Sequence, residues 1–182
     1  DGAANNFLAA LWPGPGVLGV CLADASTGEV KLAEPAWGEA SGFLSRLPVS
    51  EWLLPAPGDL EADGAARLEA VVAGFPGARS TAAARRFLDE ALPAARWGPA
   101  GAELLRGLPV AALAAAAGLD YLDRVQGGAA LQLTRVERWS EEAVLRYDGA
   151  TARHLELFHP QPGGEGSHTL WRHLNLCISP PG

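Results

Sequence analysis

Eight consecutive residues, Val17-Leu18-Gly19-Val20-Cys21-Leu22-Ala23-Asp24, decide the fold of this chain. A strand with one face in water alternates apolar and polar residues, and this stretch is too continuously apolar for that pattern. It therefore predicts a central strand that is covered on both faces. The next four residues, Ala25-Ser26-Thr27-Gly28, predict a hairpin turn in which Gly28 adopts positive φ. Glu29–Glu34 then alternates outward and inward residues, which predicts a half-buried partner strand.

Working outward, apolar spacing and Pro or Gly breaks divide the rest of the chain into strands and helices. Further strands are expected at Phe7–Leu11 and Glu51–Leu54, and helices at Trp37–Leu47, Leu60–Val72, Ala82–Leu92 and Val110–Val125. Strands that alternate with helices predict an α/β layer fold. In the C-terminal third the sequence predicts a strand pair, Leu131–Arg138 with Ala143–Tyr147, and short helices at Ala150–Phe158 and Thr169–Leu176.

Two of these helices carry specific expectations. The Ala82–Leu92 helix is expected to begin after a cap at Ser80 or Thr81, to bury Phe87, Leu88 and Leu92 on one face, and to end at Pro93. Pro109 fits the first turn of the Val110–Val125 helix. The apolar stripe of that helix is expected to contain Leu113, Ala117, Tyr121 and Val125.

Composition and charge limit the possible functions. Hydrophobic residues make up 48% of the 182 residues, which is enough for a core, and the net charge is −7. Up to Gly107 there are 8 basic and 13 acidic residues, and after it 6 basic and 8 acidic. Neither part has the positive field that drives binding to phosphate backbones, so strong direct DNA binding is not expected.

The cysteines and the ends of the chain bear on its location and completeness. Two cysteines make no disulfide framework, which favours a reducing cytoplasm. No apolar run approaches ~18 residues, so no membrane span is expected. The chain has no Met and ends at Ser179-Pro180-Pro181-Gly182, and both features predict a segment of a longer protein.

Two carboxylates are candidates for metal-dependent nuclease chemistry. Asp24 ends the central strand and Glu51 begins another, whereas a two-metal nuclease needs three or four converging carboxylates. No further acid lies inside an apolar strand to complete such a cluster. The alternative role of Asp24 is to cap the backbone of the turn at Ala25–Gly28.

A zinc site in the C-terminal third is a second alternative. The residues that suggest it are His154, His159, His168, His173 and Cys177. The spacing within each His pair is unlike that of the common tight zinc-ligand pairs, and surface histidines explain the residues equally well. We therefore assign no metal ligand.

Four charged residues are candidates for a partner-docking surface: Arg85, Arg86, Asp89 and Glu90. The simplest interpretation is a solvated helix face with local ion pairs. The alternative is that the four residues form part of a surface that binds another protein.

Six segments in order resemble one family. They are Asn5–Leu11, Val20–Glu29 with the turn Asp24-Ala25-Ser26-Thr27-Gly28-Glu29, Leu47–Pro55, Ala115–Gln126, Leu145–Leu157 and Thr169–Gly182. The family is that of the bacterial MutS proteins of DNA mismatch repair. The sequence departs from its usual pattern at His154, Asn175 and Pro181.

The resemblance implies a fold and a division of the chain. Residues 1–107 would form an RNase H-like connector domain, a mixed sheet flanked by helices. Residues 108–182 would be a linker helix and the truncated, mainly α-helical start of the core domain. The partners implied are MutL, the remaining MutS domains and, in the full-length protein, a second MutS subunit.

The resemblance also implies that this chain does no chemistry. The family's mismatch wedge, Phe-x-Glu, does not occur, and the only Lys, Lys31, is not part of a P-loop. ATP, Mg²⁺ and mismatched DNA would therefore be bound only by the full-length protein, through parts outside this chain. We expect a non-enzymatic connector that transmits movement and presents a MutL-docking surface.

Overall fold

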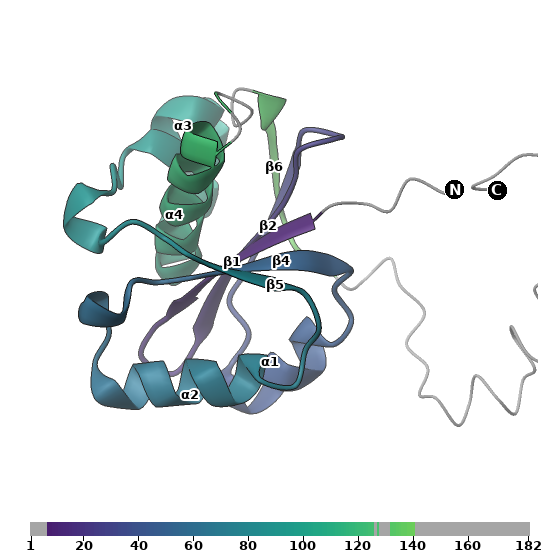
Figure 1. Ribbon diagram of the computed structural model, residues 1–182. Helices are drawn as coiled ribbons and strands as arrows, with labels where there is room; N and C mark the ends of the chain where they lie inside the picture. The colour runs from purple at the N-terminus through teal and green to yellow at the C-terminus, as the bar shows by residue number, and fades with distance from the viewer. Residues whose placement is uncertain (1–6, 126, 128–131, 141–182) are drawn as a thin grey trace, which may run out of the picture. The chain divides into compact units, whose positions relative to one another are not determined.

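The computed structural model describes residues 7–125, 127 and 132–140 of the chain (Figure 1). Contacts within the chain separate one unit, Asn5–Trp139, from a second formed by Asp1–Ala4 and Ser140–Gly182. All the helices and strands described below belong to the first unit. The predicted elements Ala143–Tyr147, Ala150–Phe158 and Thr169–Leu176, and the four histidines with Cys177, lie outside the described residues.

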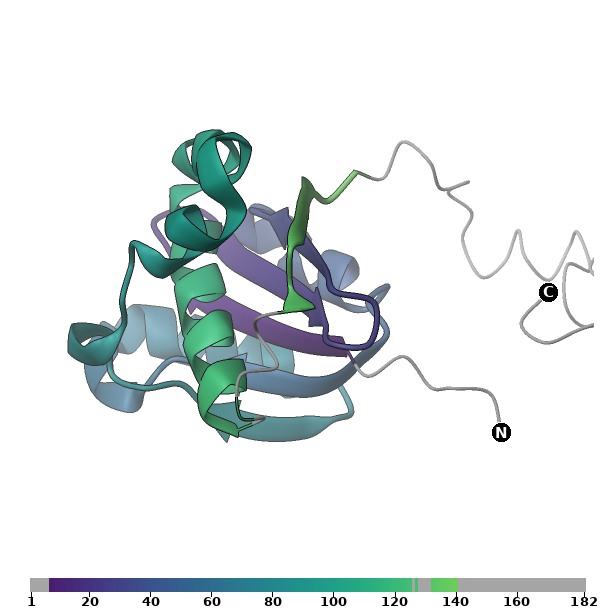
Figure 2. The same cartoon turned by 90° about the horizontal axis from the view of Figure 1, so that it is seen from above.

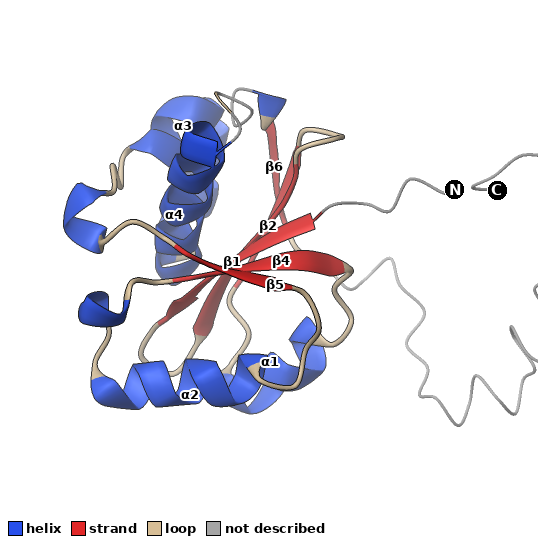
Figure 3. Cartoon of the chain, viewed as in Figure 1, coloured by secondary structure: helices blue, strands red, loops and turns tan. Residues whose placement is uncertain are grey.

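A six-stranded mixed sheet, in the order β5-β4-β1-β2-β3-β6, forms the centre of the unit. Its strands are β1 (Phe7–Pro13), β2 (Leu18–Asp24), β3 (Glu29–Ala33), β4 (Val49–Leu54), β5 (Ala78–Thr81) and β6 (Arg135–Arg138). β2 is antiparallel to both β1 and β3. β4 is parallel to β1 and to β5, and β6 is parallel to β3. Figure 3 shows the sheet between its helices, which confirms the predicted α/β class.

The central position predicted for the Val17–Asp24 stretch is confirmed. β2 lies between β1 and β3, and all seven of its residues are buried. The turn that follows contains Gly28 with φ 77°, which a residue with a Cβ rarely adopts. β3 has the expected alternation, because Val30 and Leu32 are buried while Glu29 and Lys31 are partly exposed.

Helices cover both faces of the sheet, as the continuous apolar character of β2 requires (Figure 1, Figure 2). They are α1 (Trp37–Leu44), α2 (Ala62–Val72), α3 (Leu92–Arg106) and α4 (Pro109–Val125), with 3-10 turns η1 (Pro57–Asp59) and η2 (Arg85–Phe87). α1 and α2 pack on one face around Leu11, Val20 and Trp52. α3 and α4 pack on the other face, around a second buried cluster that includes Leu32 and Leu53.

Small residues bring α4 unusually close to the sheet. A Cβ built on Gly19 of β2 would lie 2.4 Å from the carbonyl oxygen of Val110, so only glycine fits there. On the helix side, a Cβ on Gly118 would lie 3.3 Å from the Cβ of Ala10. The alanine-rich sequence of α4 therefore reflects close packing on β1 and β2, where larger side chains would hold the helix away.

The first turn of α4 is capped by a residue from a distant part of the chain. One carboxylate oxygen of Glu34 accepts hydrogen bonds from the backbone N–H groups of Val110 at 2.6 Å and Ala111 at 2.9 Å. These N–H groups have no partner inside the helix, and a negative charge at this end also complements the helix dipole. Glu34, immediately after β3, thus fixes the start of α4 against the sheet.

The predicted Ala82–Leu92 helix is wrong. Residues 78–81 form β5, Arg85–Phe87 is a 3-10 turn, and the α-helix begins at Leu92, after the predicted helix should have ended. Pro93 occupies the first turn of α3, where its missing N–H costs nothing. It therefore lies at the start of a helix and does not end one, as had been predicted.

The predicted apolar stripe of α4 is only partly correct. Ala117 is buried, whereas Val125 is 59% exposed. The buried face instead runs through Ala111, Ala115 and Leu122. No helix among the described residues is long and apolar enough to cross a membrane.

Candidate functional site

The carboxyl ends of three neighbouring parallel strands meet at one edge of the sheet. β1, β4 and β5 run in the same direction, and each is followed at this edge by a loop or a short helix. We call this the carboxyl edge, formed by residues 14–16 after β1, η1 after β4 and residues 82–91 after β5 (the β5–α3 loop). Open α/β sheets bind ligands outside the carboxyl ends of their strands, which makes this edge the first place to look for a site.

The β5–α3 loop carries all four residues predicted as a docking surface, and all four are exposed. The guanidinium of Arg85 lies 2.8 Å from a carboxylate oxygen of Glu90, and the backbone N–H of Arg85 donates to Asp59 at 2.5 Å. The hydrogen bond to Glu90 raises the pKa of Arg85. Partial burial lowers this pKa, but the negative charges of Glu90 and Asp59 raise it further. The loop is thus tied to η1, although the four residues do not lie on an α-helix.

An exposed aromatic ring lies at the centre of the same loop. Phe87, which the sequence analysis placed on a buried helix face, is 68% exposed. The guanidinium carbon of Arg86 lies 4.7 Å from the centre of its ring, within cation–π range. Leu88 is the buried anchor of the loop, and Asp89 accepts a hydrogen bond from the backbone N–H of Ala91 at 2.9 Å. Pro93 was the signal for this arrangement, because a helix starting at Leu92 leaves Phe87 in a loop.

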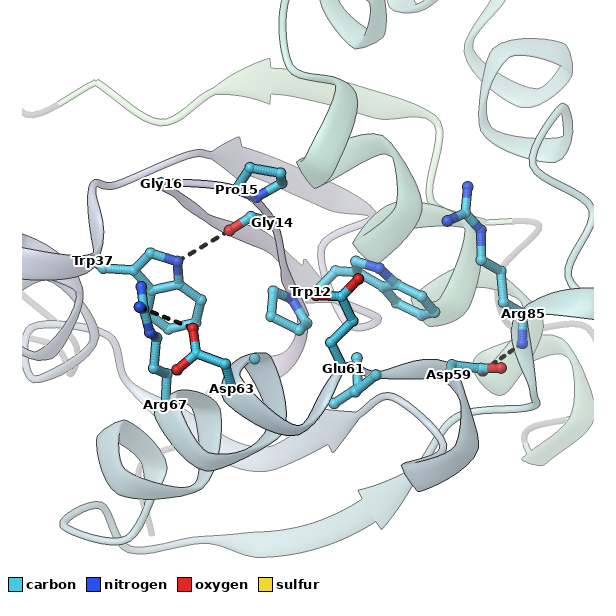
Figure 4. Close-up of a pocket in the computed structure, with 13 residues that line it drawn as sticks. Trp12, Gly14, Pro15, Gly16, Trp37, Asp59, Glu61, Asp63, Arg67 and Arg85 are labelled. Atoms are coloured by element: carbon cyan, nitrogen blue, oxygen red, sulfur yellow. Dashed lines mark hydrogen bonds and ion pairs between the residues drawn. The ribbon is translucent and has the colours of Figure 1, made fainter.

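A pocket of about 360 Å³ opens at the carboxyl edge beside this loop (Figure 4). Its walls come from the end of β1, from the following Gly14-Pro15-Gly16 turn, from Trp37 and from the first turns of α2. Arg85 belongs both to the β5–α3 loop and to the lining of the pocket. The two features therefore form one continuous candidate surface.

The two nuclease candidates do not converge. In the sheet register Asp24 pairs with Phe7 and Glu51 pairs with Leu8, two neighbouring residues of β1 that point to opposite faces. Glu51 lies on the face covered by α4, where it accepts a hydrogen bond from Tyr121. Among the described residues no group of three or more His, Cys, Asp or Glu side chains is placed to hold a metal ion.

Asp24 instead stabilises the hairpin turn, the alternative role that the sequence offered. One oxygen of this 1% exposed carboxylate accepts hydrogen bonds from the backbone N–H of Ser26 at 2.8 Å and from its hydroxyl at 2.6 Å. Burial alone would raise the pKa of Asp24, but hydrogen bonds from Ser26 and Thr27 outweigh that effect and lower the pKa. The carboxylate is therefore a structural anion.

Replacing Asp24 by alanine should destabilise the fold in a pH-dependent way. We expect a loss of about 1–2 kcal/mol in the free energy of unfolding at pH ~7, because the donors of Ser26 lose their acceptor. The folded pKa lies below the unfolded value of about 3.9, so the stabilisation is present above that value and is lost as the pH falls through the folded pKa. Urea unfolding of the protein and the variant at pH ~7 and pH ~3 measures this. Asp24→Asn keeps an acceptor oxygen and should lose less, and an Asp24→Ala loss that is equal at both pH values would contradict the assignment.

Glu51 joins a polar network between the sheet and α4 that no sequence pattern predicted. Its carboxylate accepts hydrogen bonds from Ser80 of β5 and from the Tyr121 hydroxyl, each at 2.5 Å. The hydrogen bond to Glu51 raises the pKa of Tyr121, with burial also contributing, although the contact with Ser80 opposes the shift. The network fixes the second half of α4 to β4 and β5, while Glu34 fixes its start.

The one cysteine among the described residues is also structural. Cys21 is 2% exposed, and burial raises the pKa of its thiol to about 12. The thiol therefore stays protonated and inaccessible, as expected for a small buried apolar residue.

The arrangement defines an α/β module, a mixed six-stranded sheet between helices, with the candidate surface at its carboxyl edge. No family model matches the sequence. The chain is 34% identical over its whole length to the DNA mismatch repair protein MutS of Anaeromyxobacter sp. (strain Fw109-5), of which it covers 20%. It is 34% identical over 92% of its length to MutS of Anaeromyxobacter dehalogenans (strain 2CP-C), and 32% identical over 86% to MutS of Rhodopseudomonas palustris (strain HaA2), covering 19% and 18% of those proteins.

The chain thus corresponds to a segment of the MutS family of DNA mismatch repair proteins, which confirms the resemblance found in the sequence. It spans about a fifth of the length of these curated relatives.

Proposed function

We propose that the chain is the connector part of a MutS protein, with the first part of the core, and that its carboxyl edge docks MutL. The proposal assigns residues 1–107 to an RNase H-like connector and 108–182 to a linker helix and the truncated start of the core. The order of β3-β2-β1-β4-β5, with β2 antiparallel and the others parallel, supports the RNase H-like assignment. The linker helix of this scheme is α4, which packs on β1 and β2 inside the same unit.

The exposed Phe87 is the observation that supports docking. Phe87 and Val125 are the large hydrophobic residues that the described part of the chain exposes, and of the two only Phe87 is aromatic. An aromatic ring next to arginine is the composition typical of protein–protein hot spots. Arg86 lies over this ring, and Arg85, Asp89 and Glu90 of the same loop add charges of both signs. Such a rim favours a specific orientation of a protein partner and does not favour nucleic acid.

The way in which α4 is held supports the connector role. The helix is fixed at its start by Glu34 and in its second half by the Glu51–Ser80–Tyr121 network, so it moves with the sheet as one body. We propose that this body transmits movements driven by ATP and mismatched DNA, both of which would be bound by parts of a dimeric, cytoplasmic full-length protein outside this chain. The chain itself would be non-enzymatic and would carry no cofactor.

Truncation of Phe87 tests the docking proposal. We expect Phe87→Ala to weaken binding of the MutL from the same organism by about 30-fold, the effect of a hot-spot aromatic residue, as measured by biolayer interferometry with the 182-residue chain. Because Phe87 is exposed, circular dichroism and the unfolding midpoint should be unchanged. Val125→Ala, a truncation of the exposed apolar side chain on α4, is the matched control and should bind normally. Normal MutL binding by both Phe87→Ala and Arg86→Glu would refute docking through this loop.

A further inference from the structure

Two tryptophans and one acidic residue define the chemistry of the pocket at the carboxyl edge. Trp12 and Trp37 supply aromatic walls, and Glu61, at the start of α2, supplies a carboxylate (Figure 4). The volume of about 360 Å³ lies in the range of sites that hold small ligands or single side chains. None of these three residues is among the docking residues proposed above.

Two polar groups of the pocket lack a partner in the part of the chain that the structure describes. The Trp12 side chain is almost fully buried, with 4% of the residue exposed, yet its indole N–H makes no hydrogen bond to any described residue. The indole N–H of Trp37, by contrast, donates to the carbonyl oxygen of Gly14 at 3.0 Å. The Glu61 carboxylate likewise has no ion pair or hydrogen bond within residues 7–125, 127 and 132–140. Among the described residues only the indole nitrogen of Trp139 is fully buried without a partner, so the Trp12 N–H keeps contact with solvent. The pocket therefore offers one unused donor and one unused anion.

The remaining charges of the pocket are already compensated. Asp63 pairs with Arg67 at 2.9 Å, and Asp59 accepts from the backbone N–H of Arg85, whose guanidinium pairs with Glu90. The uncompensated charge is therefore that of Glu61, and it disfavours an anionic ligand. A cation beside indole rings gains from their electron-rich faces, and guanidinium in particular stacks on aromatic rings.

We infer that the pocket receives an arginine side chain of the polypeptide that docks on the β5–α3 loop. The guanidinium binds the Glu61 carboxylate between the aromatic walls, and a backbone carbonyl oxygen of the same arginine accepts the N–H of Trp12. Arginine satisfies both unused groups at once. Its guanidinium is the cation for Glu61, and its backbone carbonyl oxygen, one side-chain length away, is the acceptor for the Trp12 N–H. The inference rests on the proposed function for its partner, since Arg85 belongs both to the docking loop and to the pocket.

The pocket can be tested without any partner protein. The probe is N-acetyl-arginine N-methylamide, titrated into the ¹⁵N-labelled chain while the indole N–H resonances are followed. We expect a saturable shift of the Trp12 resonance, assigned with Trp12→Phe. The citrulline counterpart has nearly the same shape without the charge, and it should cause no saturable shift. Equal shifts with the two compounds would overturn the inference.

Replacement of Glu61 separates recognition from general attraction. Glu61→Gln should weaken binding of the arginine probe by about three- to fivefold, the range expected for a partly exposed charge pair. Glu69→Gln, which removes an exposed carboxylate of the same helix outside the pocket lining, should bind the probe normally. Both replacements are on the surface, so the fold should persist. An affinity for the probe that is unchanged in Glu61→Gln would overturn the inference.

Measurements with MutL distinguish a failure of the inference from a failure of the proposed function. If Phe87→Ala weakens MutL binding and Glu61→Gln weakens it three- to fivefold, both stand. If only Phe87→Ala has an effect, the docking loop stands and the arginine pocket is refuted. If Phe87→Ala has no effect while the arginine probe binds in a Glu61-dependent way, the proposed MutL docking fails. The pocket then accepts arginine from a different source, which overturns the inference that the arginine belongs to the polypeptide docked on the β5–α3 loop.

Discussion

Replacing Gly19 by alanine is expected to lower the free energy of unfolding by about 3 kcal/mol. The new Cβ would lie 2.4 Å from the Val110 carbonyl oxygen and 2.8 Å from the Ala111 nitrogen. Both are backbone atoms of a capped helix, so they cannot move aside as a flexible side chain would. Overpacking of a tight core typically costs about 1–3 kcal/mol. A clash with backbone atoms should cost an amount near the upper end of this range, because the backbone cannot move aside. Urea unfolding followed by circular dichroism measures the loss.

The matched control for Gly19→Ala is the replacement of a glycine whose new Cβ would meet no neighbouring atom. Gly42 lies inside α1 with no atom within 4 Å of a built Cβ. Gly42→Ala should raise the free energy of unfolding by about 0.5–1 kcal/mol, because alanine loses less entropy than glycine in a helix. If Gly19→Ala were as stable as the unmodified protein, the close approach of α4 to β2 would be disproved.

Truncation of Leu119 is expected to have a similarly large effect. This residue of α4 is 1% exposed and belongs to the cluster between α4 and the sheet. Leu119→Ala should cost about 3 kcal/mol, because it removes buried methyl groups and leaves a cavity that alanine-rich surroundings cannot fill. The same unfolding measurement detects it.

The control for Leu119 lies on the same helix. Val125 is 59% exposed, although its spacing suggested that it would be buried, and Val125→Ala should change the free energy of unfolding by less than about 0.5 kcal/mol. A loss from Val125→Ala as large as that from Leu119→Ala would contradict the buried face of α4 seen in the structure.

The central part of the fold could be predicted because its signals are local. The apolar run of β2 and the turn at Gly28 each need only a few neighbouring residues to be recognised. β5 escaped prediction for the opposite reason. It has four residues, three of them exposed, and its pairing with β4 depends on a partner 27 residues away between Glu51 and Ala78. A short edge strand of this kind has no hydrophobic period to detect.

The errors around residues 82–92 come from competing local rules. Apolar spacing favoured a helix there, but Pro93 fits the first turn of a following helix, and the tertiary packing of Leu88 holds the segment as a loop. The charged docking residues were identified in the sequence, although on the wrong element. Phe87 was missed because an apolar residue in a presumed helix is normally assigned to the core.

The pocket could not have been predicted from the sequence. Trp12, Trp37 and Glu61 lie on three segments that only the parallel pairing of β1 with β4, and the packing of α1 and α2, bring together. The cap from Glu34 to Val110 similarly joins residues 76 positions apart. Such contacts follow from the topology of the sheet, and the spacing of residues along the sequence does not predict them.

Hydrogen–deuterium exchange of the chain with and without MutL tests the proposed docking most directly. We predict that MutL slows exchange in the β5–α3 loop, residues 82–91, and in η1. The turn at Ser26 lies at the opposite edge of the sheet, beside the start of β1, and should exchange at the same rate with and without MutL. Slowed exchange confined to that opposite edge, or none at residues 82–91 under conditions where MutL is bound, would contradict docking at the carboxyl edge.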